Sequence, residues 1–270
     1  MRIILGTDGT GASAGALEWA AARAMRDAGA AHIVVFPITH SARIAPVDSL
    51  VLTAERLLRD RAPGVRMESS QHLPGSVPGS TVGRTSGEDL LVVDSLQSIC
   101  ADESLMRFCS ESGMPIVVVP AHWTPVEGAV IVGIKDDLSA VAADVATVRA
   151  LASSSTIVAV HVWQMPLPRI EGAITLRASP IQIRAKHRSI LREAAHRLGT
   201  RNAGIPIERV LVEGNPAPEL LGRARNCSLL VIGTRRRGPV LGSIGQAVLS
   251  GATTPVLIVP ASAPDAECPG

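Results

Sequence analysis

Cations follow two apolar runs in the second half of the chain. Lys135 comes directly after the run 129–134, and three consecutive arginines at 235–237 come soon after the run 229–232. Such runs are typical of parallel strands buried on both faces, and ligands of parallel sheets bind beyond the carboxyl ends of the strands. We therefore expect these cations to meet near a helix that begins at about Gly242. Because guanidinium groups match the geometry of phosphates, the sequence predicts an anion site there.

The matching positions of the first half are acidic. Asp8 follows the apolar run 2–7, and Asp94 follows the run 90–93. We expect the two carboxylates to lie at adjacent strand ends, where they would repel a triphosphate. The sequence therefore predicts that an anion binds in the second half and not in the first.

Three enzyme patterns are present only in part. The glycines at 9–15 resemble a dinucleotide-binding turn, but no acidic residue follows the second strand at 32–38 and the chain has no tyrosine. Ser13 lies between Gly11 and Gly15 as in a hydrolase nucleophile elbow, but its distance from the strand favours a helix N-cap. Gly6 stands where the phosphatases with an Asp-x-Asp-Gly-Thr signature carry their nucleophile. We expect no catalytic residue; a hydrolase is the less favoured alternative.

Metal-ligand spacing is absent from the sequence. The four cysteines form no C-x-x-C pair and the seven histidines form no His-Glu-x-x-His motif, so we expect free thiols and no metal. His161 ends the second strand of the second half. We expect a backbone partner for its ring, with a role in the pocket as the alternative.

Short sequence patterns recur along the chain. The run 90–95 resembles 229–234, and 115–120 resembles 255–260. We infer two homologous domains, 1–121 and 128–262, joined by a linker around 123–127. Each half alternates strand and helix patterns, which predicts an α/β fold with two doubly wound parallel sheets. The strands are expected at 2–7, 32–38, 65–72, 89–94 and 115–119, and the helices at 13–28, 48–61, 78–86, 102–112 and 179–199.

The residues at the strand ends resemble the universal stress protein family. The opening 3–10 resembles the family's first strand, and 229–235, 242–248 and 255–259 resemble its phosphate loop and last strand. The resemblance covers nearly all of both halves. It implies two tandem Rossmann-like domains of the adenine nucleotide alpha hydrolase-like type, whose last strands pair to form an internal pseudo-dimer. It also implies regulatory binding without catalysis, and many members bind ATP.

The family motif is incomplete in both halves. The Asp that contacts adenosine in family members matches Asp8, but the first half lacks the phosphate loop. In the second half Lys135 replaces that Asp, Arg236 replaces a loop glycine, and the loop before Gly242 is shorter. The residues that we expect to bind ATP or another anion are Asp8, Gly9, Lys135, Gly233, Thr234, Arg236, Gly242 and Ser243. The alternative is an interaction protein in which both pockets are degenerate.

Composition limits the partners. The 26 basic and 24 acidic residues nearly cancel, which argues against nucleic acid as the partner. Arg184, Arg188 and Arg192 share one face of the predicted helix 179–199; a solvated face is the simpler interpretation, and an acidic partner is the other.

The chain lacks a signal peptide and a long apolar run, so we expect a cytoplasmic protein with an unknown protein partner and no membrane contact. Further dimerisation stays open. With only three Trp, two Phe and no Tyr, the core must be aliphatic.

Overall fold

The structure is a computed structural model of the chain. The residues that it describes are 2–7, 14–26, 32–37, 47–70, 89–94, 114–135, 156–165, 169–171, 174–176, 179–233 and 241–259. The helices predicted at 78–86 and 102–112 lie outside these ranges.

The first half contains five strands and two helices among its described residues. They are β1 (Arg2–Thr7), α1 (Ala14–Arg26), β2 (His32–Pro37), α2 (Val47–Arg61), β3 (Arg66–Ser69), β4 (Leu90–Val93) and β5 (Ile116–Val118). Each strand lies within its predicted range. Continuous runs of mainly Ile, Leu and Val suit a buried parallel sheet in four of these strands, whereas the edge strand β3 is polar and partly exposed.

The second half repeats this order with an insertion. Its elements are β6 (Val130–Ile134), β7 (Ile157–Trp163), β8 (Arg169–Glu171), β9 (Ile174–Leu176), α7 (Pro180–Arg201), β10 (Ile207–Glu213), α8 (Pro216–Ala224), β11 (Leu229–Gly233), α9 (Ser243–Gly251) and β12 (Val256–Val259). The insertion contains β8 and β9, which pair with each other as a small antiparallel sheet.

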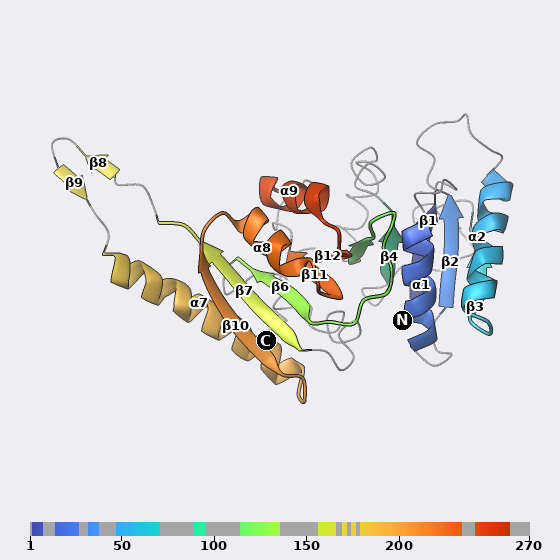
Figure 1. The fold of residues 1–270 in the computed structure, drawn as a ribbon, viewed down its shortest axis with the longest axis horizontal. Helices are drawn as coiled ribbons and strands as arrows, with labels where there is room; N and C mark the ends of the chain where they lie inside the picture. The colour runs from blue at the N-terminus through green and yellow to red at the C-terminus, as the bar shows by residue number, and fades with distance from the viewer. Residues whose placement is uncertain are drawn as a thin grey trace, which may run out of the picture.

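Ten strands form one continuous sheet, in the order β10-β7-β6-β11-β12-β5-β4-β1-β2-β3 (Figure 1). Every neighbouring pair is parallel except β5 and β12, which run antiparallel with Val117 opposite Leu257. The order on one side of this pair therefore repeats in reverse on the other side. Two doubly wound parallel sheets thus form an internal pseudo-dimer through their last strands, as predicted. The domain limits 1–121 and 128–262 stay a prediction.

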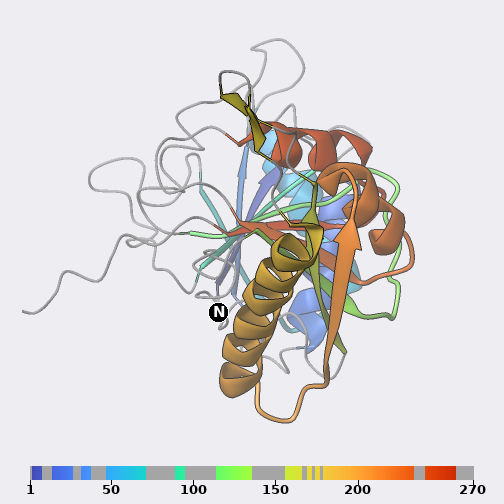
Figure 2. The ribbon, with the colours of Figure 1, turned by 90° about the vertical axis from the view of Figure 1, so that its left-hand side faces the viewer.

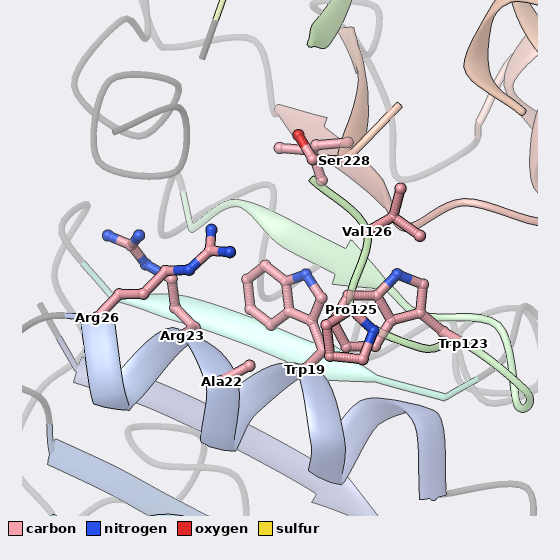
Figure 3. A pocket seen from close by; sticks show the side chains of 9 residues that line it. Trp19, Ala22, Arg23, Arg26, Trp123, Pro125, Val126 and Ser228 are labelled. Atoms are coloured by element: carbon pink, nitrogen blue, oxygen red, sulfur yellow. The ribbon is translucent and has the colours of Figure 1, made fainter. Parts of the chain in front are cut away.

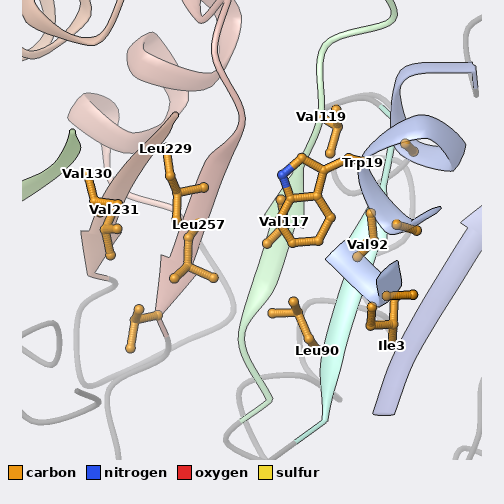
Figure 4. Packing of buried hydrophobic residues seen from close by; sticks show 14 of the residues in the cluster. Ile3, Trp19, Leu90, Val92, Val117, Val119, Val130, Leu229, Val231 and Leu257 are labelled. Carbon is orange, nitrogen blue, oxygen red and sulfur yellow. The ribbon is translucent and has the colours of Figure 1, made fainter. Parts of the chain in front are cut away.

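The helices cover both faces of the sheet (Figures 1 and 2). One buried cluster joins α1, α2 and α7 to the strands of both halves, and Figure 4 shows this cluster on both sides of the junction. A second cluster on the opposite face joins α8 and α9 to the sheet. The side chains in both clusters are mainly Ala, Val, Leu and Ile, as the poverty in aromatic residues implies.

Helix α1 packs closely on the segment that leaves the first half. A Cβ built on Gly15 would collide with the carbonyl oxygen of Pro120, which is backbone and has no rotamer to change. Glycine is therefore needed at the start of α1 for close approach rather than for a special backbone conformation. The chain then turns at Ala121 and His122, where the backbone N–H of Trp123 donates to the Pro120 carbonyl at 3.0 Å.

Candidate functional site

The carboxyl ends of β6 and β11 lie side by side. The two strands are parallel, with Leu229 beside Val130 and Val231 beside Val132. Continued by two residues, this register places Gly233, the last residue of β11, beside Ile134. Lys135 follows Ile134 directly, and both Lys135 and Gly233 are exposed. The structure thus brings the predicted lysine and the first predicted loop glycine to one edge of the sheet.

Helix α9 begins at the same edge, because it connects β11 to the parallel strand β12. Gly242 precedes the helix in an extended conformation and, as a glycine, has no side chain that could cap it. The first hydrogen bond of the helix runs from the N–H of Gln246 to the carbonyl of Gly242, at 3.0 Å. The N–H groups of the preceding three residues, including Ser243, therefore have no acceptor within the helix. They and the positive end of the helix dipole can accept an anion.

Half of the predicted site lies outside the described residues. Asp8, Gly9, Thr234 and Arg236 fall there, as do Arg235 and Arg237. Their part in the site stays a prediction. Lys135, Gly233, Gly242 and Ser243 are the predicted site residues that the structure places.

The equivalent edge of the first half carries a buried carboxylate. β1 and β4 are parallel neighbours with Leu5 beside Val92, and this register leads to Thr7 beside Asp94. Both side chains are buried, with exposed fractions of 1% for Thr7 and 4% for Asp94. A buried carboxylate at a strand end disfavours a phosphate at that position.

An imidazole pair lies next to the carboxyl end of β6. His161 in β7 is buried, and its Nδ1 lies 2.8 Å from the carbonyl oxygen of Ile134. A carbonyl only accepts, so Nδ1 must carry the proton. Nε2 of His161 lies 2.8 Å from Nδ1 of His187 in α7, and the His187 ring stacks on Trp163 with centroids 4.9 Å apart. His161 thus has the expected backbone partner, together with a second partner, His187, that was not predicted.

The surroundings of His187 favour the neutral form of its ring. Burial lowers the pKa of His187, and the neighbouring His161 and Lys186 lower that pKa further. A neutral His187 can donate its Nδ1–H to Nε2 of His161, whose own Nδ1–H donates to the Ile134 carbonyl. The pair therefore joins the amino-terminal half of α7 to β7, and through Ile134 it also joins α7 to the strand end that Lys135 follows.

His187 was missed although the sequence carried a signal for it. It occupies the apolar face of α7, in a series with Ile183, Leu191, Ala194 and Leu198 at helical spacing. A histidine within such a series indicates a buried polar partner. The arginines at 184, 188 and 192 are all exposed, which fits the predicted solvated face of this helix.

Metal ligands, thiols and membrane-spanning helices were also considered in the part of the molecule that the structure describes. No group of three or more metal-ligating side chains occurs there. Among the cysteines, Cys227 lies within the described residues and is free. Its thiol contacts the Arg223 carbonyl, and burial raises the pKa of that thiol. None of the described helices has the length and apolar character needed to cross a membrane.

The comparisons with known proteins point to one family. The model of the universal stress protein family matches residues 128–260. A universal stress protein of Mycobacterium tuberculosis is 30% identical over 159 residues, which cover 53% of this chain and 48% of that protein. The match therefore spans about half the length of this relative. A second universal stress protein of the same organism is 27% identical over 233 residues, which cover 78% of this chain and 74% of that protein.

The solved structures agree in fold. The crystal structure of a universal stress protein from Archaeoglobus fulgidus superposes with a TM-score of 0.63 at 13% identity, covering 97% of this chain and 98% of that chain. Such a match includes both halves and the junction between them. By sequence, residues 128–260 therefore belong to the universal stress protein family, and the chain as a whole has the fold of the Archaeoglobus fulgidus protein.

Proposed function

We propose that this chain is a regulatory binding protein of two domains, 1–121 and 128–262, whose second domain binds a phosphate-bearing anion. ATP is the first candidate, because many members of the family that the sequence resembles bind it. The observation that carries the proposal is the position of Lys135 at the sheet edge where α9 begins after Gly242. A lysine and a helix N-terminus together stabilise a phosphate better than either does alone.

Lys135 changes how a nucleotide would be held. In family members an Asp at the equivalent position contacts the adenosine, whereas an ammonium group suits a phosphate. Arg236 follows β11 in the sequence and would supply a second cation. We therefore propose that phosphate recognition dominates in this protein and that the contact to the nucleoside is weaker than in the family.

Calorimetric titration tests the proposal with ATP, ADP, AMP and inorganic phosphate as ligands. A charge-assisted hydrogen bond contributes about 1.5–3 kcal/mol, so Lys135→Ala should weaken ATP binding about tenfold or more. Arg225→Ala is the matched control, because Arg225 is exposed and lies beyond the amino end of β11, at the opposite edge. Its affinity should equal that of the wild type.

A second candidate is an interaction protein with two empty pockets, which the buried Asp94 favours for the first half. Denaturing the purified protein and analysing the supernatant separates the two candidates. Released nucleotide in proportion to protein supports binding in the second domain. No released nucleotide, together with no heat from any of the four ligands, contradicts the proposal and favours the interaction protein.

A further inference from the structure

The sheet ends at β10 with an edge that has no partner among the strands that the structure describes. β10 closes the strand order on one side, where it pairs with β7. Figure 2 shows β10, drawn in orange, beside α7 on the side of the molecule that faces the viewer. An unpaired strand presents free N–H and C=O groups, so this edge can pair with a further strand.

The register with β7 decides which backbone groups of β10 point outward. The N–H of Ile157 in β7 donates to the carbonyl of Pro206, just before β10, at 2.9 Å. At the other end, the N–H of Gly214 donates to the carbonyl of Trp163 at 2.9 Å. The backbone groups of successive strand residues point to alternate sides. The even-numbered residues of β10 therefore bond to β7, and the odd-numbered residues present their N–H and C=O groups at the open edge.

Two of these outward-bonding residues carry unmatched charges. Arg209 and Glu213 are exposed, and neither forms an ion pair with another described residue. Both lie on the face of the sheet that α7 covers, because Ile207 and Leu211, on the same side of the strand, pack against the buried cluster of that face. Val210 packs against the cluster of the opposite face.

A second copy of the chain would meet this edge in an antiparallel arrangement, because a two-fold axis reverses the direction of the strand. Outward-bonding residues must then lie opposite each other. With the axis at Leu211, Arg209 lies opposite the partner's Glu213, and the same ion pair forms a second time by symmetry. On the other face, Val210 lies opposite the partner's Val212. The strand is thus complementary to itself in charge and in hydrophobicity.

Neighbouring registers match less well. With the axis at Arg209, the guanidinium group would face its own copy, and like charges directly opposite each other destabilise a sheet. With the axis at Val210, Arg209 would lie opposite the partner's Leu211, and its charge would stay unmatched. The charges therefore select the register that is centred on Leu211.

The opposite edge of the sheet, at β3, has the features of a protected edge. β3 has four residues, and Nη2 of its Arg66 donates to Oε1 of Glu68 at 2.7 Å, so these charges pair within the strand. β10 has seven residues and contains neither the Pro nor the Lys that commonly protects an edge. Pairing with a further strand is therefore favoured at β10.

The last strands of the two halves are not available for such pairing. β5 and β12 pair with each other inside the chain. Residues of both halves, among them Trp19, Trp123 and Ser228, line a small cleft of about 50 Å³ where the halves meet (Figure 3). Further association must therefore use an outer edge.

We propose that two copies of this chain associate through β10, in antiparallel register with the two-fold axis at Leu211. The ten-stranded sheet then continues into the partner, and Arg209 and Glu213 fix the register. This association does not involve Lys135, so it is independent of anion binding in the second domain.

Sedimentation equilibrium of the full chain without nucleotide measures the association. We expect the wild type to form a dimer. Arg209→Glu and Glu213→Arg each place like charges opposite each other twice, so each should raise the dissociation constant of the dimer about tenfold or more. The double variant Arg209→Glu/Glu213→Arg restores opposite charges in both pairs and should associate as the wild type does.

Arg66→Glu is the matched control, because it makes the same change of charge at the opposite edge of the sheet. It should associate as tightly as the wild type. A wild type that sediments as a single chain at all concentrations overturns the proposal and leaves the edge to another partner. The proposal also fails if both single variants associate as the wild type does, or if the double variant is no tighter than the single ones.

Discussion

Replacing Gly15 with alanine should destabilise the protein, although the same change usually stabilises a helix. Alanine in a helix is favoured over glycine by about 0.5–1 kcal/mol. At Gly15 the added Cβ would meet the carbonyl oxygen of Pro120 well inside van der Waals contact. Because that oxygen is backbone, relief requires α1 or the segment after β5 to move. Overpacking of this kind costs about 1–3 kcal/mol, so we expect a net loss of about 1–2 kcal/mol.

Gly222 in α8 is the matched control. A Cβ built on Gly222 meets nothing within 4 Å, and the residue is exposed. Gly222→Ala should therefore raise the free energy of unfolding by about 0.5–1 kcal/mol. The two identical substitutions should thus have effects of opposite sign.

Urea unfolding followed by far-ultraviolet circular dichroism measures both variants against the wild type. Equal slopes with shifted midpoints would show that stability alone has changed. If Gly15→Ala is as stable as the wild type or more so, the close packing of α1 on Pro120 is refuted. If Gly222→Ala destabilises the protein, the comparison based on helix propensity fails instead.

Two further predictions concern charged groups. Burial first, then His161 and Lys186, lower the pKa of His187 below its ordinary value of 6.5. The unfolded chain then binds the proton more tightly than the fold does, so stability is full above about pH 6.5 and falls on acidification below it. His187→Gln should reduce this fall in urea unfolding at about pH 5.5 relative to about pH 8, and an unchanged pH dependence would exclude His187 as a cause. Asp89→Ala should cost about 3–5 kcal/mol because it leaves the half-buried Arg2 without its partner carboxylate; Nη2 of Arg2 lies 2.6 Å from Oδ2 of Asp89. The double variant Arg2→Met/Asp89→Leu should recover part of that loss in thermal unfolding, and a fully additive loss would contradict the pairing.

The sheet was predictable because its strands are apolar on both faces. The runs around Leu90 and Leu229 carry the same pattern and occupy equivalent positions in the two halves. The pairing of the last strands, β5 and β12, was implied by the family resemblance. The pair of β8 and β9 was missed, since a Pro-rich stretch favours loop over strand.

The site was predictable only where it depends on strand ends. The positions of Lys135 and Gly233 follow from the strand periodicity, and the start of α9 follows from Gly242. The contact of His161 with His187, in contrast, depends on tertiary packing. It joins a strand to a helix more than twenty residues away, so its existence depends on how α7 packs on β7 rather than on local sequence.

The antiparallel junction separates the two candidate anion positions. Because β5 and β12 run in opposite directions, the carboxyl ends of the two half-sheets face opposite edges of the molecule. An anion beside Lys135 therefore contacts the second half alone. A ligand that binds only the folded state stabilises it by about 2.7 kcal/mol at a concentration one hundred times its dissociation constant. ATP at such a concentration should accordingly raise the midpoint of urea unfolding in the wild type and less in Lys135→Ala, and an equal shift in both would place its binding elsewhere.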